Sequence, residues 1–189
     1  MKEEVNDRTF FGFWVYLMTD LLMFGGLFAA FAVLRTNSFG GVTEKDIYNL
    51  PYVLLESVLL LTSSFTAGLA ILSSTKGNVK AVIGLLFATF LLGVSFLGME
   101  LYEFSNLFKE GHTFQKSAFL SSYFTLVGTH GVHILVGLIW MIILFIYILK
   151  RGLTKSALRK LTLFSLFWHF LDIVWIFIFT IVYLMGVSL

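Results

Sequence analysis

The chain has 189 residues, of which 58% are hydrophobic and only 13% are charged, and its mean hydropathy is +0.91 with a net charge of +2. Soluble domains usually carry about 25% charged residues, so this composition excludes an ordinary soluble domain, and the small net charge does not indicate a nucleic-acid partner. The absence of cysteine excludes disulfides and thiolate metal sites. The composition predicts an all-α integral membrane protein.

Five stretches are long and apolar enough to cross a bilayer as helices, since a span needs about 20 mostly apolar residues. The first follows a segment of mixed charge that lacks the positive start of a signal peptide, so we expect it to be retained. Only short polar segments separate the five stretches, and no linker or repeat divides them. We therefore predict one membrane domain over 1–189 with spans at about 10–34, 51–74, 80–105, 118–149 and 161–186.

The distribution of Lys and Arg predicts the orientation, because positively charged segments beside a span tend to stay in the cytoplasm. With five spans, the N-terminal tail shares one side of the membrane with the loops near 75–80 and 150–160, and this side carries nine Lys and Arg. The other side carries four. We therefore expect the N-terminus to be cytoplasmic and the C-terminus to be extracytoplasmic.

Five of the eleven acidic residues fall inside the predicted spans, whereas no Lys or Arg lies well inside one. These acids are Asp20, Glu56, Glu100, Glu103 and Asp172. An ionised Asp at the centre of a membrane helix costs roughly 3 kcal/mol on insertion scales. The five groups must therefore be protonated, hydrogen-bonded, hydrated or buried against another surface.

Three histidines, His130, His133 and His169, lie at a similar depth. Residues three apart share a helix face, which groups Glu100 with Glu103, His130 with His133 and His169 with Asp172. Each pair is compatible with a proton path, a metal site or a structural hydrogen-bond network. An iron or zinc site formed by the histidines and a carboxylate is the sharper alternative, but no H-x-x-x-H or E-x-x-H motif is present. We expect this chain to bind no metal and no cofactor.

Other patterns indicate packing and contact with the membrane interface. Small residues four apart let helices approach closely, and they occur at Gly25/Ala29, Gly26/Ala30, Ser63/Ala67 and Ser64/Gly68. Aromatic residues within about two turns of a span end are predicted to be interface anchors, namely Trp14, Tyr16, Trp168 and Tyr183. Trp140 and Trp175 lie deeper and are expected to pack against neighbouring helices.

Four stretches, in order along nearly the whole chain, resemble subunit III of the haem-copper terminal oxidases. They are FGFWVYLMTDLLMFGGLFAAFAVL at 11–34, FLGMELYEF at 96–104, GTHGVHILVGLIWM at 128–141 and FWHFLDIVWIFIFTIVYLMG at 167–186. The G-x-H-G-x-H and W-H-F-x-D-x-V-W motifs in them are specific to that family. The resemblance is greatest to subunit III of bacterial cytochrome bo-type ubiquinol oxidases.

The resemblance implies a subunit that is not itself a redox protein. In this family haem and copper sit in subunit I, and in relatives that use cytochrome c metal also sits in subunit II. Subunit III packs against subunit I, joins the other oxidase subunits, binds phospholipid and supports assembly, stability and proton uptake. The chain would belong to an enzyme only as part of the complex, in the bacterial inner (cytoplasmic) membrane, and would carry no catalytic centre. We therefore predict the non-catalytic subunit III of a proton-pumping quinol:oxygen oxidoreductase of the aerobic respiratory chain.

The resemblance also implies roles for the polar residues of the spans. Four acids are implied to support proton uptake: Asp20 matches the family's membrane carboxylate, often a Glu, while Glu100 and Glu103 match its paired glutamates and Glu56 matches a Glu of bo-type relatives. We expect Asp20 to be protonated near neutral pH or paired with a polar group on subunit I. Five further residues match the two motifs, and we predict from their place inside the spans that they form a structural polar network, namely His130, His133, Trp168, His169 and Asp172.

One departure from the family and two alternatives limit this interpretation. Mitochondrial-type relatives have seven helices with a lipid-filled cleft between the first two and the last five, and this chain matches them from the third helix onward, so the lipid site does not carry over directly. The first alternative is subunit III of a bacterial cytochrome c oxidase. The second is a small proton-coupled transporter, which would often show inverted repeats or broken helices, and neither is visible.

Overall fold

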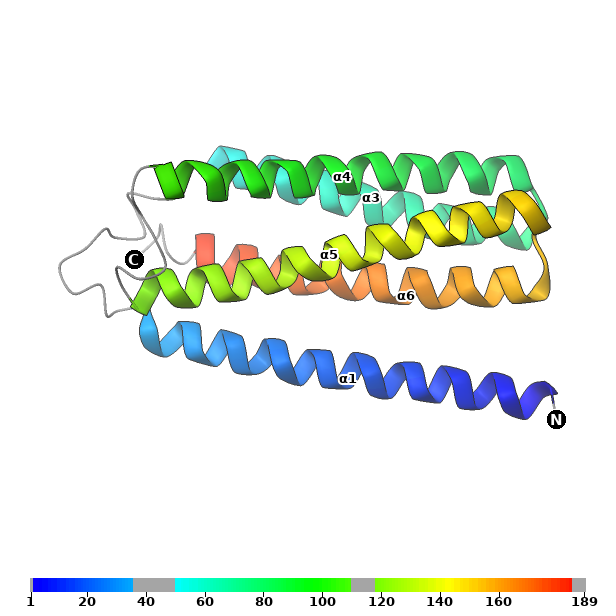
Figure 1. The fold of residues 1–189 in the computed structure, drawn as a ribbon, viewed down its shortest axis with the longest axis horizontal. Helices are drawn as coiled ribbons and strands as arrows, with labels where there is room; N and C mark the ends of the chain where they lie inside the picture. The colour runs from blue at the N-terminus through cyan, green and yellow to red at the C-terminus, as the bar shows by residue number, and fades with distance from the viewer. Residues whose placement is uncertain (1, 36–49, 110–117, 185–189) are drawn as a thin grey trace.

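The computed structural model describes residues 2–35, 50–109 and 118–184, and every regular element in these ranges is helical (Figure 1). The elements are α1 (Lys2–Leu34), α3 (Leu50–Thr75), α4 (Val79–Lys109), α5 (Ala118–Arg151), α6 (Lys155–Ile178) and a terminal π-helical segment, η1 (Phe179–Leu184). Five of these helices are long and apolar enough to cross a membrane, the last one together with η1. The prediction of an all-helical protein with five membrane-crossing helices is confirmed.

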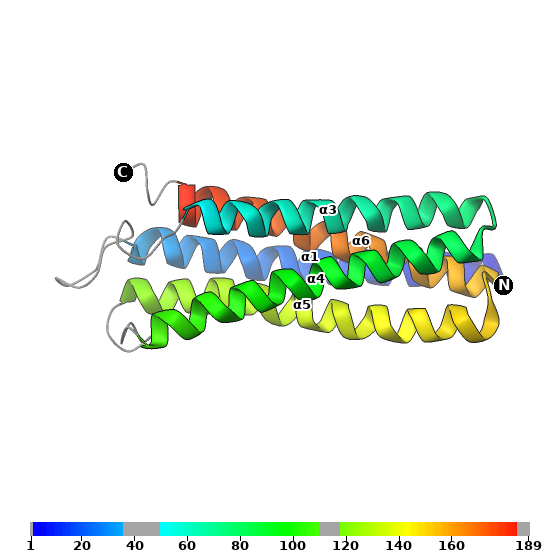
Figure 2. The ribbon, with the colours of Figure 1, turned by 90° about the horizontal axis from the view of Figure 1, so that it is seen from above.

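The five helices run along one common axis, and each points opposite to the one before it (Figures 1 and 2). The most extensive contact is between α3 and α4, α6 packs on both α3 and α5, and α1 packs on α5 and less extensively on α6. One end of the bundle therefore holds the start of α1 and the turns that join α3 to α4 and α5 to α6. The opposite end holds the end of α1 and η1 (Figure 1).

The core lies around α6, while α1 covers one edge. In the most apolar stretch of the last span, 50% of the residues are buried within the chain, whereas in the most apolar stretch of α1 only 17% are. The largest fully buried side chains include Trp168 and Trp175 of α6 and Tyr123 of α5. Most side chains on the outer surface of the bundle are apolar, as a surface in contact with lipid tails requires.

Short capped turns join the two helix pairs that meet at the N-terminal end of the bundle. Gly77 and Gly152 take positive φ angles of 70° and 67°, a conformation that glycine adopts without steric cost at the end of a helix. The next helix then starts on a polar side chain. The Asn78 Oδ1 and Thr154 Oγ1 atoms each accept a hydrogen bond at 3.2 Å from the backbone N–H three residues later.

The start of the last helix differs from the prediction. The sequence predicts a loop over 150–160, but α6 already begins at Lys155, six residues before the predicted start of the span. The cap at Thr154 explains the earlier start. Of the five basic residues that indicated a loop, Lys150 and Arg151 end α5, and the other three lie on the first turns of α6. The Lys160 ammonium sits over the Tyr147 ring at 4.0 Å, so its charge is accommodated at the helix surface.

Some sequence predictions fall outside the described residues. They include most of the predicted loops at 35–50 and 106–117, and the predicted end of the last span at residue 186. Of the third loop, residues 106–109 belong to α4.

Candidate functional site: polar groups inside the bundle

Three side chains of α6 are hydrogen-bonded to three serines of α3, and we call these contacts the serine ladder. Its pairs are Trp168 Nε1–Ser63 Oγ at 2.8 Å, His169 Nδ1–Ser64 Oγ at 2.5 Å and Trp175 Nε1–Ser57 Oγ at 3.0 Å. Hydrogen bonds between membrane helices are structurally important because lipid offers buried polar groups no partner. The ladder therefore joins α3 to α6 over nearly two turns of each helix.

Trp168 occupies a narrow slot between α4 and α5. A Cβ atom at Gly137 would lie 2.8 Å from the Trp168 ring, and one at Gly93 would lie 3.0 Å from it, so both helices approach the ring only because these positions are glycine. Trp168 is fully buried. The prediction that it anchors the chain at the membrane interface is wrong, because α6 starts six residues earlier than predicted and carries Trp168 into the bundle.

Asp172 lies beside the serine ladder. Asp172 is 8% exposed, and its carboxyl group interacts with Ser64 and His169. His169 and Asp172, which the sequence places on one helix face, therefore meet the same serine of α3. Within the described ranges, the Asp172 Oδ1 atom has no hydrogen-bond partner.

A second group, which we call the acid–tyrosine cluster, consists of Glu56, Glu100, Glu103, Tyr123 and Tyr183. The Tyr123 hydroxyl donates to Glu103 Oε1 at 3.5 Å and lies 2.9 Å from the Tyr183 hydroxyl. Glu56 and Glu100 are buried, and their carboxyl groups lie close enough to each other and to Glu103 to interact electrostatically. Burying charges this close together is costly unless protons or hydrogen bonds compensate.

Two features of the acid–tyrosine cluster were not foreseen from the sequence. Tyr183 is predicted to be an interface anchor, but it is fully buried because it turns inward from η1 to Tyr123. In addition, a Cβ atom at Gly131 would lie 3.1 Å from Glu100 Oε1. The second glycine of the G-x-H-G-x-H motif thus makes room for a carboxyl group of α4.

The two histidines of that motif have different surroundings. His130 is fully buried and stacks on Trp175, with ring centroids 5.3 Å apart. Neither of its ring nitrogens has a hydrogen-bond partner among the residues that the structure describes. His133 instead places Nδ1 2.8 Å from the Thr129 carbonyl oxygen and Nε2 3.7 Å from Asp20 Oδ2. The structure therefore places Asp20 beside a residue of its own chain, and the two histidines have different partners.

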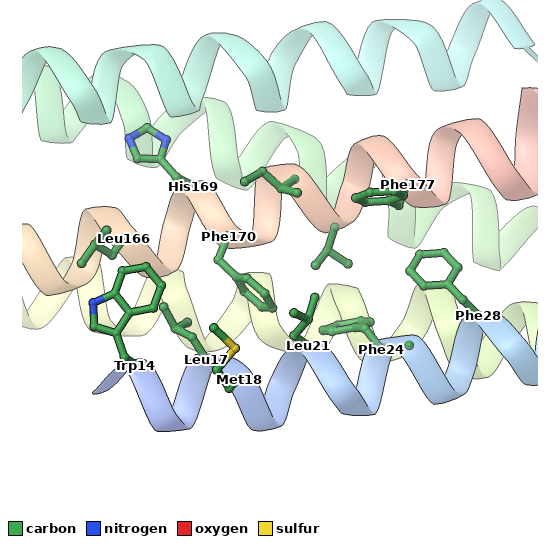
Figure 3. Close-up of a pocket in the computed structure, with 13 residues that line it drawn as sticks. Trp14, Leu17, Met18, Leu21, Phe24, Phe28, Leu166, His169, Phe170 and Phe177 are labelled. Carbon is green, nitrogen blue, oxygen red and sulfur yellow. The ribbon is translucent and has the colours of Figure 1, made fainter. Parts of the chain in front are cut away.

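An apolar groove of about 480 Å³ runs between α1 and α6 (Figure 3). Its walls include Trp14, Leu21 and Phe28 on α1 and Phe170 and Phe177 on α6. The His169 ring also borders the groove, but Figure 3 shows it turned away from α1, in agreement with its bond to α3. The groove therefore offers almost purely apolar surface.

Comparison with known proteins agrees with this architecture. The sequence model of the family described as Cytochrome c oxidase subunit III matches residues 2–187. The chain belongs to this family. It is therefore an integral membrane protein of a family of oxidase subunits, as the two sequence motifs predict.

Three relatives show the range of complexes in which the family occurs. The chain is 55% identical to cytochrome bo(3) ubiquinol oxidase subunit 3 of Pseudomonas aeruginosa, over 96% of this chain and 87% of the relative. It is 42% identical to quinol oxidase subunit 3 of Bacillus subtilis, over 99% and 92% of the two chains. It is 44% identical to cytochrome c oxidase subunit 3 of Bacillus sp. PS3, over 96% and 87%.

The family's histidines and acids do not converge as metal ligands in this structure. Among the side chains that the structure describes, in residues 8–35, 50–109 and 118–184, no three His, Asp or Glu residues come together in a group that would hold a metal ion. His169 is turned to Ser64, and His130 is enclosed by aromatic rings. The statement that this chain binds no metal or cofactor remains a prediction.

Several residues that build these sites escaped the sequence analysis. Ser63 and Ser64 were predicted only as small packing residues, and Ser57 and Tyr123 were not singled out. One signal was available: the serines of the ladder lie within 57–64 and their partners on α6 lie within 168–175, so both sets extend over seven residues. A shared spacing of two helical turns is the pattern expected of two packed antiparallel helices that meet along one seam.

Proposed function

We propose that this chain is the non-catalytic subunit III of a proton-pumping quinol:oxygen oxidoreductase in the bacterial inner membrane. The observation that carries this proposal is the 55% identity, over 96% of the chain, to a ubiquinol oxidase subunit 3. The internal geometry supports it, because several polar side chains of the spans bind one another, as in the serine ladder and the contact of Tyr123 with Glu103. A transporter function is disfavoured by the family match, which covers residues 2–187.

The proposed partners follow from the family. Subunit I is proposed as the main contact and as the site of the haem and copper, with further contacts to the other oxidase subunits. Phospholipid is proposed to contact the apolar outer faces and the groove between α1 and α6, whose lining is apolar over several turns of both helices.

The polar residues are proposed to act in two ways. His130, His133, Trp168, His169 and Asp172 form a structural polar network, and the contacts of the serine ladder support this role. Asp20, Glu56, Glu100 and Glu103 support proton uptake by keeping subunit I and its surroundings in place. Asp20 is our preferred functional acid, because it lies near the middle of the span Arg8–Leu34.

We further propose that the N-terminus is cytoplasmic and the C-terminus extracytoplasmic, on the basis of the excess of Lys and Arg at one end of the bundle. In that orientation the acid–tyrosine cluster lies in the outer half of the membrane, since Glu56 is six residues, or about 9 Å, from the start of α3. A reporter enzyme fused after Leu189 should be active only outside the cytoplasm. Activity in the cytoplasm would contradict the orientation.

A second candidate is subunit III of a cytochrome c oxidase, which the relative from Bacillus sp. PS3 favours. The two candidates differ in the electron donor of the whole complex. Purification of the tagged chain in mild detergent should recover a haem-bearing partner, and the recovered complex should consume oxygen with a quinol but not with reduced cytochrome c. Oxygen uptake with cytochrome c alone would select the second candidate, and recovery without any haem protein would refute both.

A further inference from the structure

We infer that the acid–tyrosine cluster holds two protons: Glu56 and Glu100 are kept as neutral carboxylic acids, and Glu103 is the member that ionises first. The inference does not rest on the proposed function, because it concerns hydrogen-bond donors and acceptors within this chain alone. It follows from comparing the carboxyl oxygens that the cluster encloses with the donors that reach them.

The cluster encloses more carboxyl oxygens than it has donors. Five of its six carboxyl oxygens are buried and have no hydrogen-bond partner among the residues that the structure describes, namely both oxygens of Glu56, both of Glu100 and Oε2 of Glu103. The sixth, Glu103 Oε1, accepts from the Tyr123 hydroxyl at 3.5 Å. The Tyr183 hydroxyl lies 2.9 Å from that of Tyr123 and also interacts with Glu103. Both tyrosines therefore serve Glu103.

No basic side chain in the interior of the described helices supplies the missing donors. The stretches of the four surrounding spans that contain no Lys or Arg are 51–75, 81–108, 118–149 and 161–184. His130 precedes Gly131, against which Glu100 packs, but neither of its ring nitrogens has a hydrogen-bond partner in the described part of the chain. The groups that act most strongly on the three carboxyls are the carboxyls themselves, with Tyr123 and Tyr183.

Other titratable groups at this end of the bundle point elsewhere or act less on the cluster. On α3, the Tyr52 hydroxyl donates to a backbone carbonyl oxygen of α4 at 3.0 Å. On α4, Tyr102 and Lys109 are exposed. On α1, Arg35 follows the end of the helix but is not among the groups that act most strongly on the carboxyls. Glu56 and Glu100 thus have neither a cation nor a hydroxyl to stabilise a negative charge.

Protons on Glu56 and Glu100 compensate for this shortage. Three carboxylates would place three negative charges close together inside the bundle, and an unpaired charge is the most costly group to bury. A protonated carboxyl group is neutral, and it donates as well as accepts a hydrogen bond, so neighbouring carboxyls can satisfy one another. Glu103 needs a proton least, because hydroxyl donors stabilise the ionised form of a carboxyl group.

The surrounding fold makes the charge of this site important for packing. Glu56 is fully buried, and the Glu100 carboxyl lies against the backbone of α5, where a Cβ atom at Gly131 would be 3.1 Å from Oε1. The cluster joins α3, α4, α5 and η1. Loss of a proton would therefore leave an unpaired charge where four elements meet, and we expect this end of the bundle to loosen as the pH rises.

The infrared spectrum of the purified complex tests the two protons directly, because carboxylic acids and carboxylates absorb at different frequencies. Near neutral pH, Glu56→Gln and Glu100→Gln should each remove one carboxylic-acid band. Glu103→Gln, in the same cluster, is the matched control and should leave both of these bands in place. A Glu56→Gln or Glu100→Gln spectrum that keeps every carboxylic-acid band of the unaltered complex would overturn the proposal.

The pH dependence of thermal unfolding separates bound protons from simple packing. An amide is neutral at every pH and, like a carboxylic acid, both donates and accepts a hydrogen bond. The double variant Glu56→Gln/Glu100→Gln should match the unaltered complex at about pH 6, but between about pH 6 and about pH 9 its unfolding midpoint should fall by about 3 °C less. A fall equal to that of the unaltered complex, or failure of the double variant to assemble, would contradict the inference. Neither measurement needs turnover, so an incorrect electron donor would not affect it.

Discussion

The first and last membrane helices of this chain hold their polar residues in different ways. Three side chains of α6 bind three serines of α3, and Trp168 of α6 fills a slot between Gly93 and Gly137. By contrast, α1 has one buried acid with one histidine beside it, and an apolar groove separates part of it from α6. The two helices are therefore fixed differently: α6 is held by many polar and close-packed contacts, whereas the position of α1 depends on very few contacts.

The largest effect should come from filling the slot around Trp168. Gly137→Val would push a side chain into the Trp168 ring and should destabilise the chain by about 1–3 kcal/mol, the usual cost of overpacking a core. The matched control is Gly26→Val on α1, where no described atom lies within 4 Å of an added Cβ. Thermal denaturation of the purified complex measures both. An equal loss from the two variants would mean that α1 is packed as tightly as α6.

A smaller effect is expected at Asp172, next to the serine ladder. Asp172→Asn should lose no more than about 0.6 kcal/mol, because an amide still forms a hydrogen bond with Ser64 or His169. Asp172→Leu should lose about 1–3 kcal/mol by leaving those groups partly unsatisfied, and it should loosen association with the other subunits. The fraction of the chain that stays bound to the complex on heating measures which of the two variants loses more stability. A fully assembled Asn variant without oxygen reduction would rule out a purely structural role.

The smallest effect should occur at the surface, where Lys160 lies over Tyr147 across the turn between α5 and α6. Lys160→Gln removes the cation but keeps most of the side-chain length, so the midpoint of thermal unfolding should fall less than for Asp172→Leu. Lys155→Gln, in the first turn of the same helix, serves as the control for loss of a positive charge. A fall as large as that of Gly137→Val would show that the core does not dominate the stability of α6.

The sequence allowed prediction of the elements of this fold better than of their contacts. Hydropathy located five spans because burial in lipid demands a long apolar run, and the spacing of His169 and Asp172 placed both correctly on one face of α6. The start of α6 was misjudged because the charged first turn of a capped helix has the composition of a loop.

The partners of the buried polar groups were not accessible to the same reasoning. A spacing of three residues shows which side chains share a helix face, but not which neighbouring helix that face meets. The positions of His130 and His133 illustrate this: they share a face by spacing, yet one stacks on Trp175 and the other meets Asp20. The close approach of the Glu100 carboxyl group to Gly131 likewise depends on how α4 is rotated about its axis relative to α5.

The central claim is that this chain supports the oxidase without taking part in its chemistry, and Asp20→Ala tests it most directly. Steady-state oxygen uptake by the assembled complex should be followed to exhaustion, together with the haem spectrum and the number of protons pumped per electron. We predict an initial rate and a haem spectrum close to those of the unaltered complex, followed by a faster loss of activity or a lower pumping ratio. An immediate and complete loss of turnover in a fully assembled Asp20→Ala complex would contradict the account, because it would place Asp20 on the obligatory reaction path.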